Sequence, residues 1–253
     1  MGRIISFANQ KGGVGKTTTC VYMSAFMALM GKKVLMIDLD PQGNATSNLG
    51  FSKDGKFNSI YQVLSDEVSV ENAIYETKIK NLSLIPSNIH LAGVEVELVY
   101  MNSREFVIKN ILDKIKDSYD YITIDCPPSL ELLTLNALCA ADAILVPVQC
   151  EYFALEGLSD LMATLRMVKR KINPRLEIFG VALTMFDGRT NFSTQVAQEV
   201  RRHFPGKVFS TVIPRNIRLS EAPSHGVPVL GYDRSSKGAK AYKEMADEMK
   251  AKL

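Results

Sequence analysis

The sequence predicts an α/β fold in which a doubly wound, mostly parallel sheet is flanked by helices. Short apolar runs alternate with helical segments along nearly all of the 253 residues, as in strands joined by right-handed crossovers. Several runs lack polar alternation, which is typical of strands covered on both faces. The first run leads through a glycine-rich loop into a helix, the context of a phosphate-binding loop.

The apolar runs predict strands at residues 3–9, 34–38, 82–85, 121–125, 143–148, 178–184 and 208–213. A first helix is predicted over 16–30, where Gly31 ends it, and further helices near 90–99, 104–117, 130–141, 156–171, 193–203 and 237–252. Residues 51–75 indicate short helices and turns, inserted over the sheet edge. No Pro/Gly/Ser-rich linker divides the chain, so we expect residues 1–253 to form a single domain.

Composition places the chain among globular proteins, with 46% hydrophobic and 23% charged residues. No apolar run reaches the roughly 18 residues that cross a bilayer, and the first residues show no basic leader, so we expect a cytoplasmic protein. The cysteines, Cys20, Cys126, Cys139 and Cys150, lie far apart in apolar sequence and match no zinc or redox spacing. They are expected to be buried thiols.

Charge is unevenly distributed along the chain. Residues 1–150 carry 13 Lys and Arg against 16 Asp and Glu, a net charge of −3. Residues 151–253 carry 17 against 11, a net charge of +6. A basic C-terminal half permits a polyanionic partner without requiring one.

Residues 7–18 read FANQKGGVGKTT, and the closing GKTT is how a phosphate-binding loop ends. The usual spacing, G-x-x-x-x-G-K-[ST], places a glycine where Gln10 stands, and Lys11 adds a charge. Glycines let the backbone curl and aim N–H groups inward, and the N-terminus of the following helix favours anions. We expect phosphates to be bound by Gly12, Gly13, Val14, Gly15, Lys16, Thr17 and Thr18.

Within this loop, Lys16 is placed to reach the β- and γ-phosphates, the Thr17 hydroxyl to ligate Mg²⁺, and Thr18 to bond the α-phosphate. Two strand-end acids complete the predicted site, Asp38 in DLDPQG and Asp125 in YITID. Ligands bind at that end of a parallel sheet. Strand-end aspartates also commonly cap the next helix, and that alternative stays open for each acid taken alone.

Five stretches together resemble the ParA/Soj chromosome-partition ATPases, in the deviant-Walker-A (ParA/MinD) group of P-loop ATPases. They are KGGVGKTT, DLDPQGN, DCPPSL, PVQCEYFALEGL and VIPRNIRLSEAPSHG, and the resemblance covers residues 3 to 250. It implies ATP and Mg²⁺ as cofactors and slow hydrolysis. It also implies that Lys11 reaches the phosphates bound by a second subunit in an ATP-dependent homodimer.

The resemblance assigns further roles around the nucleotide. It makes Asp40 the residue that orients the attacking water, and places Asp38 and Asp125 around the metal and its waters. It places the adenine near Met185, Pro214 and Asn216. An asparagine in a polar loop is as often a turn residue, so the last assignment rests mainly on the resemblance.

Three classes of output share this type of ATPase. The first binds DNA without sequence preference, and the resemblance places Arg189 and Arg218 at DNA-contacting positions, with Arg215 in the same basic half. Surface ion pairs are the alternative for each arginine. In this class the protein is nucleoid-associated, and a ParB-type centromere-binding protein stimulates hydrolysis and release.

The second class is a MinD-like membrane switch, which needs an amphipathic helix that enters the lipid interface. Near the C-terminus a stripe of Tyr242, Met245, Ala246, Met249 and Leu253 is short and lacks Phe and Trp. We therefore expect this stripe to pack on the domain, without stable membrane binding. The third class, an iron–sulfur reductase with a cluster cysteine at Cys126, fits poorly because the surrounding DCPPSL has the partition-ATPase form.

Overall fold

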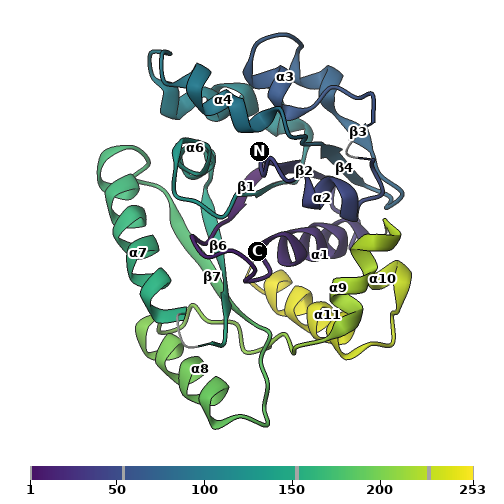
Figure 1. Cartoon of the computed structure of the whole chain (residues 1–253), viewed down its shortest axis with the longest axis vertical. Helices are drawn as coiled ribbons and strands as arrows, with labels where there is room; N and C mark the ends of the chain where they lie inside the picture. The colour runs from purple at the N-terminus through teal and green to yellow at the C-terminus, as the bar shows by residue number, and fades with distance from the viewer. Residues whose placement is uncertain (1, 53–54, 152–153, 227–228, 253) are drawn as a thin grey trace.

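The computed structural model describes residues 2–52, 55–151, 154–226 and 229–252. Within them a seven-stranded sheet lies at the centre, with helices on both faces (Figure 1). The strands are β1 (Arg3–Phe7), β2 (Val34–Asp38), β3 (Tyr75–Glu76), β4 (Leu82–Ile85), β5 (Tyr121–Asp125), β6 (Ala143–Gln149) and β7 (Glu177–Thr184). Their order is β3-β4-β2-β5-β1-β6-β7, and only β3 pairs in antiparallel fashion. The predicted fold class is confirmed.

The described helices are α1 (Lys16–Leu29), α2 (Asn44–Asn48), α3 (Ile60–Leu64), α4 (Leu91–Leu98), α5 (Val107–Leu112), α6 (Leu132–Ala140), α7 (Ala154–Lys171), α8 (Asn191–His203), α9 (Ile217–Glu221), α10 (Val229–Tyr232) and α11 (Lys237–Lys250). Short 3₁₀ turns occur at η1 (Val70–Ala73), η2 (Arg104–Phe106), η3 (Lys116–Ser118) and η4 (Ala222–His225). None of the helices in the described ranges is both long and apolar enough to span a bilayer.

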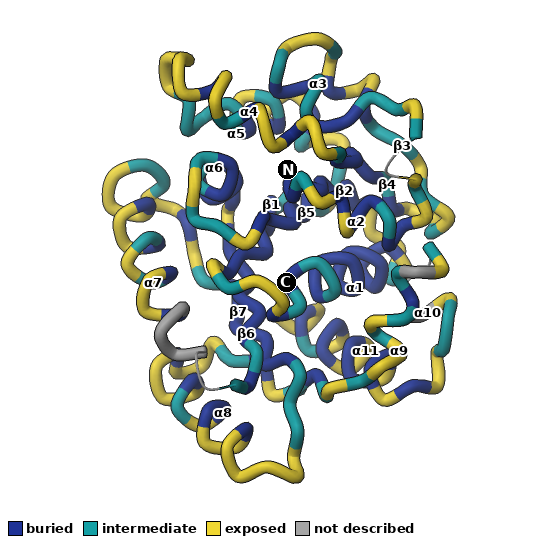
Figure 2. Tube along the Cα trace, viewed as in Figure 1, coloured by how far each residue is buried: buried dark blue, intermediate teal, exposed yellow. Residues whose placement is uncertain are grey.

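Successive residues of each central strand enter two separate cores. Ile4 packs in the core beneath α4 to α8, whereas Ile5 packs in the core beneath α1 and α11. Figure 2 shows the strands buried at the centre of the molecule, with the outer faces of the covering helices exposed. All four cysteines are buried free thiols, as expected. The continuous apolar runs therefore reflect strands that are covered on both sides.

The predicted strand at 208–213 is wrong, since only isolated bridges form there, between Val181 and Val208 and between Phe186 and Pro214. The N–H groups of Phe209 and Ile213 donate to the carbonyls of Val181 and Leu183 of β7, but those of Ser210 and Thr211 between them donate to Glu248 of α11, which interrupts the ladder. The predicted helix at 104–117 is divided into η2, α5 and η3. The insertion at 51–75 contains the expected short helices and ends in the antiparallel edge strand β3, which was not predicted.

The apolar stripe near the C-terminus packs inside the protein, as expected. Tyr242, Met245, Ala246 and Met249 of α11 are buried, and Leu253 lies outside the described residues. The Tyr242 ring stacks on Tyr22 of α1 at a centroid distance of 4.6 Å, and its hydroxyl lies 3.0 Å from that of Thr19. These four side chains of α11 therefore hold it against α1.

Gly50, which follows α2, lies close to Gly226, which follows η4. Gly31, after α1, serves as the comparison because it has a similar backbone conformation and no such contact. Gly50 and Gly31 have almost equal positive φ values, 86° and 87°. A Cβ on Gly31 would meet nothing within 4 Å, whereas one on Gly50 would lie 2.8 Å from the carbonyl oxygen of Gly226. The two positions share backbone strain and differ in this contact.

We predict that Gly31→Ala lowers the free energy of unfolding by about 1 kcal/mol, from the left-handed backbone alone. Gly50→Ala should cost about 1–3 kcal/mol more, because the added methyl group also presses on the backbone at Gly226. Urea unfolding of both variants measures the difference. If both variants lost the same free energy of unfolding, the contact between Gly50 and Gly226 would not resist the added methyl group.

Candidate functional site

The loop between β1 and α1 (residues 10–15, the glycine-rich loop) lies at the carboxyl end of β1, which pairs with β5 and β6 inside the sheet. Gly13 and Gly15 adopt left-handed φ values of 73° and 84°, which favour glycine. Gly12 has no positive φ, and a Cβ there would approach only the Pro128 Cβ, at 3.9 Å. The expected need for glycine therefore holds at two of the three positions.

Hydrogen bonds from neighbouring strands fix the glycine-rich loop. Asn9 Nδ2 donates to the Pro147 carbonyl of β6 at 2.7 Å, and Asn9 Oδ1 accepts the Lys11 N–H at 3.1 Å. On the other side, Thr184 Oγ1 at the end of β7 donates to the Val14 carbonyl at 2.8 Å. The loop is thus held from both flanks before any ligand binds.

The backbone N–H groups from Gly12 to Thr18 find no acceptor among the described residues. Thr19 N–H is the first of α1 to bond within the chain, to the Gly15 carbonyl at 2.9 Å. Consecutive open donors at a helix N-terminus form an anion-binding site, which the partial positive charge of the helix strengthens. This row of donors fits a phosphate chain.

Lys16 lies beside this row and is only 6% exposed. Its ammonium donates to the Lys11 carbonyl at 2.9 Å. Burial lowers the pKa of Lys16, while the carboxyl groups of Asp125 and Asp40 act to raise it. The side chain of Lys11 itself is half-buried.

The sheet register brings Asp38 and Asp125 together, since they are paired residues at the ends of the adjacent strands β2 and β5. Both are fully buried. Asp38 Oδ2 accepts hydrogen bonds from the N–H and the hydroxyl of Thr46, at 2.8 and 2.7 Å, and Oδ1 accepts the Asp40 N–H at 3.2 Å. Asp38 therefore does cap α2, which was the alternative to a metal role.

Asp125 differs from Asp38, because neither of its oxygens has a hydrogen-bond partner within the described part of the chain. Burial, followed by the charge of Asp38, raises the pKa of Asp125 well above its usual range, and the nearby Thr17 hydroxyl acts to lower it. Burial also raises the pKa of Asp38 to about 6, although its hydrogen bonds act to lower it. An unpaired buried carboxyl beside Thr17 and Lys16 fits a site for a cation.

The described residues contain no cluster of three His, Cys, Asp or Glu side chains that could hold a metal alone. Mg²⁺ suits such a site better than zinc does, because it binds through few carboxylates, several waters and the phosphates of a nucleotide. Asp40 is 7% exposed, and its Oδ1 accepts the Gln42 N–H at 2.9 Å, within its own turn.

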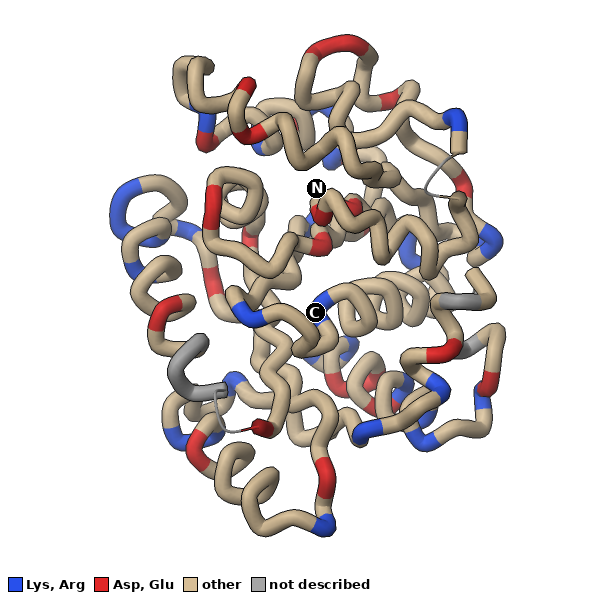
Figure 3. Tube along the Cα trace, in the orientation of Figure 1, with Lys and Arg blue, Asp and Glu red and all other residues tan. Residues whose placement is uncertain are grey.

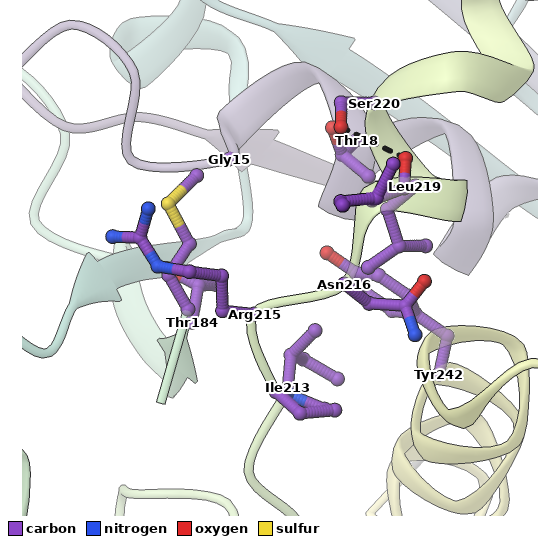
Figure 4. Close-up of a pocket in the computed structure, with 12 residues that line it drawn as sticks. Gly15, Thr18, Thr184, Ile213, Arg215, Asn216, Leu219, Ser220 and Tyr242 are labelled. Atoms are coloured by element: carbon purple, nitrogen blue, oxygen red, sulfur yellow. Dashed lines mark hydrogen bonds between the residues drawn. The ribbon is translucent and has the colours of Figure 1, made fainter. Parts of the chain in front are cut away.

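A pocket of about 270 Å³ adjoins Gly15 and Thr18 and contains the residues expected around the adenine (Figure 4). Met185, with a strained φ of 50°, follows β7, and Pro214 and Asn216 lie on the facing segment. Asn216 Oδ1 caps α9 by accepting the Arg218 N–H at 2.9 Å, so it is also a turn residue. Sequence analysis missed the other lining residues, Thr184, Ile213, Ile217, Leu219, Ser220 and Tyr242.

Each arginine expected to contact DNA is exposed and has an acidic partner. Arg189 pairs with Asp187 at 2.7 Å, Arg215 with Glu151 at 2.6 Å, and Arg218 with Glu221 at 2.8 Å. The ion-pair alternative therefore describes all three in this structure. Figure 3 shows Lys and Arg positions at the end of α7 and in α11, where Asp and Glu positions lie among them.

The sequence matches the AAA domain family over residues 2–178. It is 55% identical over 251 residues to the sporulation initiation inhibitor protein Soj of Bacillus subtilis, covering 99% of both chains. It is 48% identical over 249 residues to the chromosome partitioning protein ParA of Myxococcus xanthus, covering 98% of this chain and 88% of that protein. The chain belongs to the Soj/ParA family of chromosome-partitioning ATPases.

Solved structures agree with membership of the Soj/ParA family. Cobyrinic acid a,c-diamide synthase from Mycobacterium smegmatis, solved with bound ADP and magnesium, has a TM-score of 0.85 and 38% identity, covering 98% of this chain and 93% of that one. The cell-division ATPase MinD of Pyrococcus furiosus has a TM-score of 0.82 and 30% identity, covering 100% of both chains. This Soj/ParA chain thus has the P-loop ATPase fold and is an ATPase.

The buried carboxyl pair predicts an unusual pH dependence for this Soj/ParA protein without nucleotide. The folded state holds protons on Asp38 and Asp125 above the ordinary aspartate pKa of 3.8, so its stability falls as pH rises through about 6. Asp125→Asn removes the buried carboxyl on which burial and the charge of Asp38 act. We expect it to gain about 0.5–2 kcal/mol in free energy of unfolding at pH 8, and to show a smaller fall between pH 5 and 8.

Thermal and urea unfolding across this pH range, in EDTA, measure the effect. Glu76→Gln, which neutralises an exposed acid at the sheet edge, is the control and should follow the wild type. If the free energy of unfolding of Asp125→Asn fell between pH 5 and 8 as much as that of the wild type, the buried carboxyl of Asp125 would not cause the fall.

Proposed function

We propose that the protein is an ATP-driven switch for chromosome partition. ATP closes two copies into a sandwich dimer, the dimer binds nucleoid DNA without sequence preference, and slow hydrolysis, stimulated by a ParB-type partner, releases the copies. The observation that carries this proposal is the row of N–H donors from Gly12 to Thr18 that find no acceptor among the described residues, next to Lys16, on which the charge of the buried Asp125 acts. Residues 1–253 act as one ATPase domain.

The site residues divide the work of binding and hydrolysis. Lys16 and the loop N–H groups bind the phosphates of ATP, and Thr18 bonds the α-phosphate. Thr17, Asp38 and Asp125 would hold Mg²⁺ and its waters. Bound Mg²⁺ supplies charge neutralisation on the phosphate oxygens.

The remaining site residues position the attacking water and the adenine base of ATP. Asp40 orients the attacking water; its carboxylate lies at the site edge and is held by its own turn rather than by a distant element. Met185, Pro214 and Asn216 receive the adenine, because the pocket they line opens directly from Gly15 and Thr18.

The dimer depends on Lys11. Gly12 and Gly13 are exposed, so the glycine-rich loop lies at a surface that a second copy can approach. Two ATP–Mg complexes facing each other repel, and a lysine from each copy offsets that charge. A lysine that acts on the partner's γ-phosphate makes pairing conditional on ATP rather than ADP.

DNA binding uses the basic half of the chain. Ion pairs as exposed as those of Arg189, Arg215 and Arg218 are worth only about 0–1 kcal/mol, so DNA phosphates can replace the acids. Such contacts supply affinity and salt dependence without reading sequence. The alternative, a MinD-like membrane switch, is disfavoured because the apolar face of α11 is buried against α1.

We predict that Lys11→Ala uncouples nucleotide binding from pairing. With Mg²⁺ and a non-hydrolysable ATP analogue, light scattering should report a doubled mass for the wild type and a monomer for Lys11→Ala, which still binds the analogue. Lys32→Ala removes an exposed lysine beyond the end of α1 and should dimerise normally. A wild type that stays monomeric when saturated with the analogue would refute the dimer.

We predict that Arg189→Glu weakens ATP-dependent DNA binding for every DNA sequence and lowers the salt slope by about 1 for each phosphate that the variant no longer neutralises. Its ATPase activity without DNA should persist. Co-sedimentation with plasmid DNA and with anionic vesicles, at two salt concentrations, measures binding. Arg104→Glu, in the acidic half, should behave as wild type. Binding of the wild type to vesicles but not to DNA would favour the membrane alternative.

A further inference from the structure

The buried polar side chains at the carboxyl edge of the sheet differ in their hydrogen bonding. Across the described residues, the buried side-chain oxygens that lack any partner are those of Asp125 and the Ser87 hydroxyl. They belong to β5 and to the segment just after β4, the two strands that flank β2. Asp38, at the end of β2 between them, instead accepts hydrogen bonds through both of its oxygens.

Thr46 of α2 makes this difference. It is fully buried, and both its N–H and its hydroxyl donate to Asp38 Oδ2, at 2.8 and 2.7 Å. Its Oγ1 also accepts the Ser87 N–H at 2.9 Å. A hydroxyl has one proton, so accepting from Ser87 leaves that proton directed at Asp38.

These contacts fix one orientation of the Asp38 carboxylate. A carboxylate has about four acceptor sites, and Thr46 fills both of those on Oδ2. The Asp40 N–H takes one site on Oδ1, so the acceptor site left for an incoming donor is also on Oδ1. Without the Thr46 hydroxyl, rotation of the carboxylate would cost less.

We propose that Thr46 is a positioning residue of the ATPase site, which holds Asp38 with Oδ1 presented to the hydration shell of the nucleotide-bound cation. This inference rests on the proposed function, which places Asp38 at the Mg²⁺ site. Outer hydrogen bonds of this kind orient the groups around a metal, and their loss typically lowers metal affinity or activity about 10–100-fold.

The decisive variants are Thr46→Val, which keeps the branched shape without the hydroxyl, and Thr46→Ser, which restores the hydroxyl. We expect Thr46→Val to bind a fluorescent ATP analogue as the wild type does in EDTA, and to lose most of the gain in affinity that Mg²⁺ gives. Its kcat should fall about tenfold or more, with the Mg²⁺ concentration for half-maximal rate raised. Thr46→Ser should recover most of both.

Ser24→Ala is the matched control, because it also removes a fully buried hydroxyl with two partners, the Cys20 carbonyl and Thr123 Oγ1, each at 2.7 Å. It should lose stability with an unchanged response to Mg²⁺. Hydrogen exchange of residues 43–51 without nucleotide reports whether α2 still forms in Thr46→Val. If that variant does not fold, Thr46→Ala, with a smaller side chain, replaces it in the same comparison.

The two proposals fail in different ways. A wild type whose ATP affinity and hydrolysis do not depend on Mg²⁺ would overturn the proposed site itself. A wild type that does depend on Mg²⁺, with Thr46→Val indistinguishable from it, would overturn the role of Thr46 alone. Equal Mg²⁺ defects in Thr46→Val and Thr46→Ser would assign the effect to packing and also overturn it.

Discussion

Repulsion between Asp38 and Asp125 is the constraint to which the neighbouring structure responds. The register of β2 and β5 places the two carboxyl groups side by side, and both are removed from water. Burial raises the pKa of both carboxyl groups, and the charge of Asp38 raises that of Asp125 further, so the nucleotide-free fold carries an electrostatic cost. A pair of residues that lowers stability in this way is typical of a functional site.

The surrounding residues relieve the two acids unequally. Asp38 accepts hydrogen bonds from Thr46 and from the Asp40 N–H. Only the Thr17 side chain and the charge of Lys16 act to lower the pKa of Asp125, which burial raises. Under the proposed function, that asymmetry separates the tasks of the two carboxylates: Asp38, hydrogen-bonded through both oxygens, would contact a cation through water, whereas Asp125 would be open to direct contact. The same hydrogen bonds join α2 to the end of β2, so a change at the acids reaches α2 directly.

Local sequence predicted the strands and the left-handed glycine turns well, because both depend on neighbouring residues. The runs at 34–38, 82–85 and 121–125 match β2, β4 and β5 to the residue, and glycines mark the left-handed turns at 13 and 15. The failures involve distant partners. Glu248 takes the N–H groups of Ser210 and Thr211 out of the sheet, and Tyr242 of α11 enters the nucleotide pocket with no local signal.

The segment from Pro214 to Arg218 joins the two faces of the proposed switch. Pro214, Arg215 and Asn216 line the pocket, whereas Arg218 is exposed outside its lining. Asn216 Oδ1 accepts a hydrogen bond from the Arg218 N–H in the first turn of α9. A nucleotide that hydrogen-bonds to the Asn216 side chain would therefore change a contact of the helix that carries Arg218. Beyond that helix, η4 meets α2 where Gly226 approaches Gly50. Under the proposed function, contacts would therefore lead to the Arg218-bearing helix α9 from two sides, from the adenine pocket through Asn216 and from Asp38 through α2 and η4, which is the connection that an ATP-driven DNA-binding switch would require.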